Sequence, residues 1–266
     1  MLECRQLSCG YGKLKVITEV SLKLAPQELL AIIGPNGSGK TTLLRAISRL
    51  IKPMTGGIYL EDQNVWEIEA LDFAKTVAVV SQYLPSVEMT VEDYVLLGRM
   101  PHFQKMQFIE TPKDLQVVNE CMQMTDILHL KDKIINRLSS GERQLAQIAR
   151  ALAQSPTLLL LDEPTAHLDI THQVVILDLL KKLISQIKLT VVMVLHDLNL
   201  ASEYASCLGL MSAGRLIKLG APHEVIDYKI IEEVYKTKVV VDRNPVSSKP
   251  CVFIVPKEEL LKHRNL

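Results

Sequence analysis

The sequence lacks the apolar stretches that direct a chain to a membrane or through it. No uninterrupted apolar run approaches the roughly 20 residues that a spanning helix needs. Near the N-terminus, Glu3 and Arg5 stand where a signal peptide would be apolar. We therefore expect neither a spanning helix nor a signal peptide, and any role at a membrane would depend on a partner protein.

The sequence also lacks an excess of charge and any metal-binding pattern among its cysteines. Thirty Lys and Arg residues balance thirty Asp and Glu residues, so the chain has no excess of the positive charge that nonspecific nucleic-acid binding requires. The five cysteines form no Cys-x-x-Cys pair and have no metal-ligand spacing. These features predict reduced thiols in a cytosolic compartment and no nucleic-acid partner.

Aromatic residues are scarce at 5%, whereas 48% of the residues are apolar, mostly Leu, Ile, Val and Ala. Apolar runs predict buried strands at 29–33, 77–80, 158–161 and 190–195, and the period is helical from 90 to 138. Further strands are expected at 58–60, 207–211, 215–219 and 251–255, and helices at 40–50, from 139 through 153 and at 170–187. The pattern predicts a parallel α/β core that is interrupted by a helical insertion.

The most specific motif is Gly-Pro-Asn-Gly-Ser-Gly-Lys-Thr at 34–41, which matches G-x-x-x-x-G-K-[ST] between a predicted strand and a predicted helix. Glycines let backbone N–H groups wrap a phosphate, and the N-terminus of the helix favours the same anion. Lys40 is expected to reach the β- and γ-phosphates of ATP, and the Thr41 hydroxyl is expected to bind Mg²⁺. The predicted nucleotide-binding residues of the loop are Gly34, Pro35, Asn36, Gly37, Ser38, Gly39, Lys40, Thr41 and Thr42.

A second motif places two carboxylates, Asp162 and Glu163, directly after the predicted strand 158–161. Ligands of open α/β folds bind at the carboxyl ends of the strands. Asp162 is expected to hold Mg²⁺, directly or through water. Glu163 is expected to polarise the attacking water, a role worth roughly 10²- to 10⁴-fold in rate. Behind a phosphate loop, this pair predicts hydrolysis of a nucleoside triphosphate.

A third motif, Leu-Ser-Ser-Gly-Glu-Arg-Gln at 138–144, opens a helix, with Ser139 as the N-cap and Glu142 completing a capping box. Together and in this order, the three motifs resemble those of the ATP-binding cassette (ABC) ATPases, and the resemblance covers nearly the whole chain. The commonest family form has glycine at the position of Ser140 and glutamine at that of Glu142. Ser140 fits there if its φ is negative.

The resemblance to ABC ATPases implies roles for further residues. Tyr11 would stack on adenine, a contact worth roughly 1–3 kcal/mol; alternatively it is a surface residue of the turn at 10–12. Gln82 would sense the γ-phosphate and bind the metal, and His196 would contact the γ-phosphate. The loop 166–169 would cross to a partner cassette. Ser139, Ser140, Gly141 and Glu142 would contact the ATP that is bound to the opposite copy.

The same resemblance implies a P-loop (RecA-like) α/β core with an N-terminal antiparallel β subdomain and an inserted α-helical subdomain, in one ABC ATPase domain. The expected parts are the first part of the core at 1–82, the helical subdomain at 83–138, the second part of the core at 139–220 and a C-terminal extension at 221–266. Two copies would form a homodimer with two shared ATP sites. Permease subunits would hold that dimer at the cytoplasmic face of the membrane, and a substrate-binding protein would act indirectly.

Three segments resemble those of cassettes that drive import of iron–siderophore, haem or vitamin B12 complexes. They are 98–102 (Gly-Arg-Met-Pro-His), 196–199 and 242–245. In such cassettes Arg99, Pro101 and His102 would line the groove that receives the permease.

Other functions remain open at this point. One is the motor of an exporter or of another importer class, and another is a soluble ABC ATPase of DNA repair or translation. The single set of motifs and the absence of a coiled-coil insertion argue against the soluble ATPase. A third is a nucleotide switch without hydrolysis, and the presence of both Glu163 and His196 argues against it.

Overall fold

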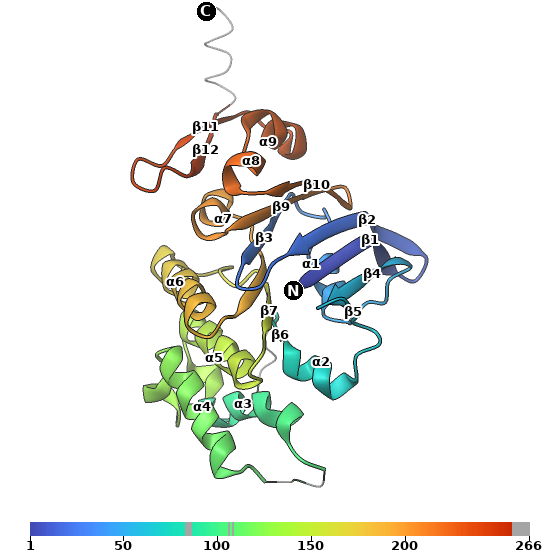
Figure 1. Ribbon diagram of the computed structural model, residues 1–266. Helices are drawn as coiled ribbons and strands as arrows, with labels where there is room; N and C mark the ends of the chain where they lie inside the picture. The colour runs from blue at the N-terminus through green and yellow to red at the C-terminus, as the bar shows by residue number, and fades with distance from the viewer. Residues whose placement is uncertain (83–86, 106, 108, 257–266) are drawn as a thin grey trace, which may run out of the picture. The chain divides into compact units, whose positions relative to one another are not determined.

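The computed structural model describes residues 1–82, 87–105, 107 and 109–256 of the 266-residue chain. These residues fold into two compact units (Figure 1). The first unit comprises Met1–Leu2, Ala25–Gln27 and Tyr59–Met193, and the second comprises Glu3–Leu24, Glu28–Ile58 and Val194–Leu266. Each unit contains segments that are far apart in the sequence, as expected of an α/β protein with an insertion.

The second unit begins with β1 (Leu2–Tyr11) and β2 (Leu14–Leu24), which neighbour each other in a sheet. The buried strand β3 (Leu29–Ile33) pairs in parallel with β9 (Cys207–Ser212), and β10 (Arg215–Gly220) pairs antiparallel to β9. The unit also contains α1 (Lys40–Ile47), α7 (Leu198–Tyr204), α8 (Pro222–Val225), α9 (Tyr228–Tyr235) and the antiparallel pair β11 (Val239–Arg243) and β12 (Pro250–Ile254). Strand β3 therefore leads directly into the loop that precedes α1.

The first unit is built on β6 (Val77–Val80) and β7 (Leu158–Asp162), which pair in parallel, with β8 (Thr190–Val194) on the other side of β7. Nearly all of their side chains are buried, because both faces of these strands are covered. The short strand β5 (Gln63–Asn64) pairs antiparallel with the end of β4 (Thr55–Leu60). Helix α6 (Ile170–Gln186) joins β7 to β8.

The expected helical insertion lies in the first unit. It contains α3 (Val91–Leu96), the 3-10 helix η1 (Leu97–His102), α4 (Pro112–Met124), η2 (Leu128–Leu130) and η3 (Ile135–Arg137). Helix α5 (Ser140–Ala153) follows and packs against both α3 and α4, and α2 (Ala70–Thr76) precedes β6. None of the helices in the described part of the chain has the length and hydrophobicity of a membrane-spanning segment.

The structure confirms most expected elements and changes a few. The strands expected at 29–33 and 77–80 have those bounds, and the strand expected at 158–161 continues to Asp162. The strand expected to begin at 58 begins at Thr55. Glycine at position 56 permits the earlier start, because it can take a φ of 76° and because a Cβ there would lie 2.3 Å from the Arg5 carbonyl oxygen of β1. Strand β11 was not expected. Strand β10 runs antiparallel to its neighbour β9, so the pairing there is not parallel as in the rest of the expected core.

The expected division of the chain into four parts stays a prediction. Residues 83–86, at the start of the expected helical subdomain, lie outside the described residues, as do the last ten residues of the expected C-terminal extension, 257–266.

Candidate active site

The loop between β3 and α1 has the backbone that a phosphate-binding loop needs. Gly34, Gly37 and Gly39 have φ values of 147°, 77° and 99°. A Cβ on Gly34 would lie 2.1 Å from the carbonyl oxygen of Met211, so no larger residue fits there. A Cβ on Gly37 would have no atom within 4 Å, and glycine is required at that position by its φ alone. The loop is therefore shaped by its glycines and is open at Gly37.

Helix α1 begins at this loop without a side-chain cap and with no acidic residue in its first turn. The N-terminus of α1 therefore carries no negative charge that would oppose an anion. The Ser38 side chain is only 2% exposed, and its hydroxyl has no hydrogen-bond partner among the described residues. A buried hydroxyl without a partner at the N-terminus of a helix fits a phosphate oxygen as the missing partner.

Lys40 is held ready within the loop. It is 5% exposed, and its Nζ donates hydrogen bonds to the carbonyl oxygens of Gly34 at 2.8 Å and Pro35 at 3.1 Å. A buried ammonium that is bonded to carbonyl oxygens loses little when phosphate oxygens replace them. Thr41, half-buried, and Thr42, buried, follow Lys40 in the first turn of α1.

Tyr11, at the end of β1, is positioned by a residue that sequence reasoning missed. Arg45 of α1 donates a hydrogen bond from Nη1 to the Tyr11 hydroxyl at 2.9 Å. The tyrosine is 45% exposed, so part of its ring is accessible for stacking. The spacing of four residues from Thr41, one helical turn, was the only signal in the sequence that could have pointed to Arg45.

His196 follows β8 and is exposed. The next residue, Asp197, is the N-cap of α7 and accepts hydrogen bonds from the backbone N–H groups of Asn199 at 2.8 Å and Leu200 at 2.9 Å. The Asn199 side chain in turn bonds both backbone groups of Val252 on β12. The segment after His196 is therefore fixed both to α7 and to the C-terminal strand.

In the first unit, Glu163 and Gln82 lie together. Gln82 Nε2 donates a hydrogen bond to Glu163 Oε2 at 2.8 Å, although the two residues are 81 positions apart in the sequence. Glu163 follows Asp162, the last residue of β7, and has a φ of 53°. A left-handed glutamate costs about 1–3 kcal/mol, and such strain is concentrated at functional sites. Sequence analysis did not predict this pairing, which brings together two of the candidate site residues.

The signature residues begin α5 as a complete capping box. Ser139 Oγ accepts from the backbone N–H of Glu142 at 3.2 Å, and Glu142 Oε2 accepts from the backbone N–H of Ser139 at 2.8 Å. These hydrogen bonds from Ser139 lower the pKa of Glu142. Ser140 is the first residue of the helix and is absent from the positive-φ residues, so the condition for accepting serine there is met.

Gly141 is buried against a residue that sequence reasoning did not assign, His172 of α6. A Cβ on Gly141 would lie 2.1 Å from Cδ2 of the His172 ring. His172 is itself fixed by Asp169, the N-cap of α6, whose carboxylate accepts from the His172 backbone N–H and contacts Nδ1, both at 2.9 Å. The hydrogen bonds from His172 lower the pKa of Asp169. His172 therefore joins the signature to the loop 166–169.

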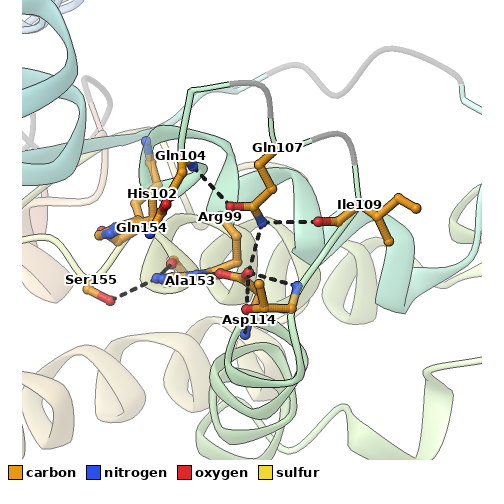
Figure 2. A network of polar contacts seen from close by, with 10 residues as sticks. Arg99, His102, Gln104, Gln107, Ile109, Asp114, Ala153, Gln154 and Ser155 are labelled. Atoms are coloured by element: carbon orange, nitrogen blue, oxygen red, sulfur yellow. Dashed lines mark hydrogen bonds and ion pairs between the residues drawn. The ribbon is translucent and has the colours of Figure 1, made fainter.

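The expectation that Arg99 lines a groove is wrong. Arg99 is 5% exposed, and its guanidinium is bonded inside the helical region, to Asp114 and to the carbonyl oxygen of Ala153 (Figure 2). A permease therefore has almost no access to this side chain. Pro101 and His102 are half-buried, and their expected role stays a prediction.

The predicted magnesium ligands supply oxygen donors, which are the donors that Mg²⁺ prefers. They are the Thr41 hydroxyl, the Gln82 amide and the Asp162 carboxylate, which is half-buried at the end of β7. No group of three or more His, Cys, Asp or Glu side chains in the described ranges is arranged to hold a metal. A sparse donor set fits Mg²⁺ that is bound together with substrate phosphates rather than in a protein cage.

The candidate residues thus form two groups. The phosphate loop, Tyr11 and His196 belong to the second unit. Gln82, Asp162, Glu163 and the signature at 139–142 belong to the first unit.

Comparisons with known proteins match the region of the chain that contains these motifs. Residues 17–166 match the family model for ABC transporters. The chain is 38% identical to the ferric enterobactin transport ATP-binding protein FepC of Escherichia coli (strain K12) over 252 residues, which cover 94% of this chain and 93% of that protein.

Solved structures agree in fold. An inward-facing metal-chelate type ABC transporter aligns with a TM-score of 0.85 and 26% identity, covering 97% of this chain and 98% of that chain. The dimeric cassette MJ0796 aligns with a TM-score of 0.71 and 28% identity, covering 83% of this chain and 98% of that chain. The expected P-loop fold is confirmed, and the chain belongs to the ABC transporter family as one of its ATP-binding, ATP-hydrolysing cassettes.

Proposed function

We propose that this cassette energises the import of a metal chelate, such as an iron–siderophore, haem or cobalamin, through a separate permease. In this proposal two copies of the chain share two ATP molecules, each bound with Mg²⁺, at the cytoplasmic face of the membrane. The main evidence for the hydrolytic part of this proposal is the hydrogen bond of 2.8 Å between Gln82 and Glu163. The backbone of Glu163 is strained, with a φ of 53°.

Nucleotide binding would exchange the partners of Lys40. Its Nζ now bonds the carbonyl oxygens of Gly34 and Pro35, and phosphate oxygens of ATP would replace them. The uncapped N-terminus of α1 would supply backbone N–H groups to the same phosphates, and the Ser38 hydroxyl would gain its missing partner. The accessible ring of Tyr11 would stack on the adenine.

Hydrolysis would use Glu163 as the base. A water oxygen attacks the γ-phosphorus, its proton goes to the Glu163 carboxylate, and ADP leaves with the bridging oxygen. Gln82 donates to one carboxylate oxygen and so fixes the orientation of the carboxylate that would take the proton. His196 would donate a hydrogen bond to the γ-phosphate.

Mg²⁺ would be held by Thr41, Gln82 and Asp162 together with the phosphates. When bound, the ion would neutralise charge on the β- and γ-phosphate oxygens.

The homodimer would complete each ATP site, because Ser139 to Gly141 would contact the nucleotide of the other copy. The dimeric cassette MJ0796, 28% identical to this chain, supports this arrangement. ATP would shift the pair toward a closed state by contacts that exist only in that state. Permease subunits would follow the closing and reopening, and a substrate-binding protein would deliver the cargo.

The metal-chelate class is supported by two independent similarities. FepC, a ferric enterobactin transport protein by name, is 38% identical to this chain, and a metal-chelate type transporter aligns over 97% of it. A motor of another ABC class is the alternative. Purifying the native complex and analysing the metal bound to its binding protein distinguishes them: a chelated metal supports the proposal, and a metal-free sugar or amino acid contradicts it.

The hydrolytic proposal is tested with Glu163→Gln. This variant is expected to bind ATP, to hydrolyse it at least about 100-fold more slowly, and to accumulate as a dimer with ATP. Glu233→Gln, an exposed glutamate on α9, is the matched control and should behave as the wild type. Sedimentation with and without ATP gives the readout. A monomeric Glu163→Gln protein that binds ATP would contradict the shared-site model.

A further inference from the structure

The C-terminal end of α5 is held by residues from elsewhere in the first unit. The last carbonyl groups of any α-helix lack partners within the helix. Here Arg99 Nη1 donates to the Ala153 carbonyl oxygen at 2.7 Å, and His102 Nε2 bonds the Gln154 carbonyl oxygen at 2.8 Å (Figure 2). Both donors come from η1, so this short helix caps α5 from outside.

The backbone of η1 also lies directly on α5. A Cβ on Gly98 would lie 2.1 Å from the Arg150 carbonyl oxygen and 2.9 Å from the Ala153 side chain. Only glycine permits this approach. Gly98, Arg99 and His102 therefore all contact the last turn of α5 or its C-cap, and this explains three of the five residues in the segment 98–102.

Arg99 connects the end of α5 to the start of α4. Its Nε donates to Asp114 Oδ1 at 3.1 Å, and the two side chains are 7% and 8% exposed. Burial by itself would raise the pKa of Asp114, but the hydrogen bonds from Thr111 and Arg99 outweigh burial and lower that pKa to about 2. The carboxylate is therefore ionised and keeps the guanidinium aligned.

Asp114 also gathers the segment that precedes α4. Its Oδ2 accepts from the Thr111 backbone N–H at 3.0 Å, from the Thr111 hydroxyl at 2.6 Å and from Gln107 Nε2 at 3.4 Å. Figure 2 shows Arg99 and Gln107 meeting at the Asp114 carboxylate. The segment before α4, α4 itself, η1 and the end of α5 are thus joined through one buried ion pair.

The other end of α5 carries the signature residues. Helix α5 has 14 residues, so at about 1.5 Å per residue it is roughly 20 Å long. A second arginine, Arg150, lies over the ring of Tyr94 in α3 at 5.2 Å and donates to the Val79 carbonyl oxygen in β6. The C-terminal half of α5 is therefore held by η1, α3 and β6, and the signature residues lie at the opposite end of the same helix.

We propose that Arg99 is a positioning residue of the ATPase. By clamping the C-terminal end of α5 to α4, it sets the direction in which Ser139 to Gly141 meet the ATP of a second copy. Arg99 thereby acts on the signature through α5 and not by direct contact with a permease. This inference rests on the proposed sharing of ATP between two copies.

The test compares Arg99→Gln with Arg99→Lys and with Arg215→Gln. Arg215 pairs with Glu19 at 3.4 Å on the surface, where both side chains are more than half exposed, so it is a matched arginine–glutamate control. Arg99→Gln is expected to lower kcat about tenfold and to raise about tenfold the ATP concentration for dimerisation in the Glu163→Gln background. ATP binding to the monomer should stay within about twofold, because the phosphate loop is untouched. Arg99→Lys should recover part of both losses.

Hydrogen exchange keeps the inference separate from the dimer model. In the monomer, Arg99→Gln is expected to raise amide exchange in the last turn of α5 and also at 142–144, whereas Arg215→Gln raises neither. If the Glu163→Gln protein never dimerises but both ends of α5 loosen, the sharing of ATP fails and the clamp stands.

Other results would overturn the clamp. One is a folded Arg99→Gln protein with wild-type dimerisation and turnover. Another is faster exchange confined to the last turn of α5. If Arg99→Gln does not fold, His102→Ala removes one carbonyl contact and should give a smaller loss of the same kind, and an unchanged kcat in that variant overturns the proposal.

Discussion

Helices α1 and α5 both begin at residues proposed to meet ATP, but the two N-termini are built differently. Helix α1 has no side-chain cap, no acidic residue in its first turn and a buried lysine as its first residue. Helix α5 has a complete capping box, and Glu142 places a negative charge in its first turn. The N-terminus of α1 therefore has no carboxylate that would oppose an anion, whereas α5 satisfies part of its N–H groups within its own chain.

The difference shows that two helix N-termini can contribute differently to the binding of one nucleotide. An uncapped helix with a lysine can bind a phosphate without help. A capped helix with a glutamate attracts free phosphate poorly, because the carboxylate opposes the anion. We therefore expect α5 to contact ATP only when a second copy delivers it. Substitutions at the two helix N-termini test this difference.

Replacing the lysine should have the largest effect, because it removes the contribution of α1 to ATP binding and hydrolysis. Lys40→Ala is expected to lower hydrolysis by about 10²- to 10³-fold, because the only ammonium in the loop is lost. ATP affinity of the monomer should fall as well, which a fluorescent nucleotide titration measures. Retained affinity would show that the N-terminus of α1 suffices without the lysine.

Filling the space at Gly141 should impair the contribution of α5 to ATP hydrolysis and leave the contribution of α1 to ATP binding intact. Gly141→Ala puts a methyl group into the His172 ring and should destabilise the protein by about 1–3 kcal/mol. Hydrolysis should fall, but ATP binding to the monomer should not. The double variant Gly141→Ala with His172→Ala should recover stability in urea unfolding. If the second substitution restores nothing, the ring is not the obstacle.

Removing the cap of α5 should have a moderate effect. Ser139→Ala is expected to cost about 1 kcal/mol of unfolding free energy and also to slow hydrolysis. Thr90→Ala removes the equivalent cap of α3, which accepts from the Asp93 N–H at 3.1 Å, and is the matched control. It should lose similar stability with unchanged turnover. Equal turnover in the two variants would deny Ser139 a role beyond capping.

Neutralising Glu142 should have the smallest effect. Its pKa is lowered in the folded state from 4.5, so its charge contributes stability above that pH, and this contribution is lost as the pH falls through the folded value. Glu142→Gln keeps the cap geometry and should remove this part of the pH dependence, a change under about 1 kcal/mol. Urea unfolding from pH 6 to pH 3 measures it, and an unchanged slope contradicts the assignment.

The comparison also shows what the sequence could reveal. The strand–loop–helix around Lys40 was predictable because glycine spacing and apolar runs report local geometry, and the capping box of Ser139 and Glu142 was predictable for the same reason. The resemblance pointed to Gln82 as a site residue, but the pairing of Gln82 with Glu163 was not predicted.

Contacts between distant segments could not be predicted. Arg99 was expected to line a groove because of the family resemblance, and only the fold brings Asp114 and the end of α5 to it. The contact of His172 with Gly141 likewise depends on how α6 packs beside α5. Strand β11 was missed because its pairing with β12 closes a turn that Asn244 organises through its side chain.

A mixing experiment tests the central claim that α1 of one copy and α5 of another share each ATP. In the Glu163→Gln background, one copy carries Lys40→Ala and the other Gly141→Ala, and mixed dimers are isolated through two different tags. The account predicts that each variant alone retains no ATP after gel filtration, whereas the mixed dimer retains one ATP, because one intact loop then faces one intact signature. A mixed dimer that retains no more than its separate components would place the loop and the signature on the same copy and contradict the account.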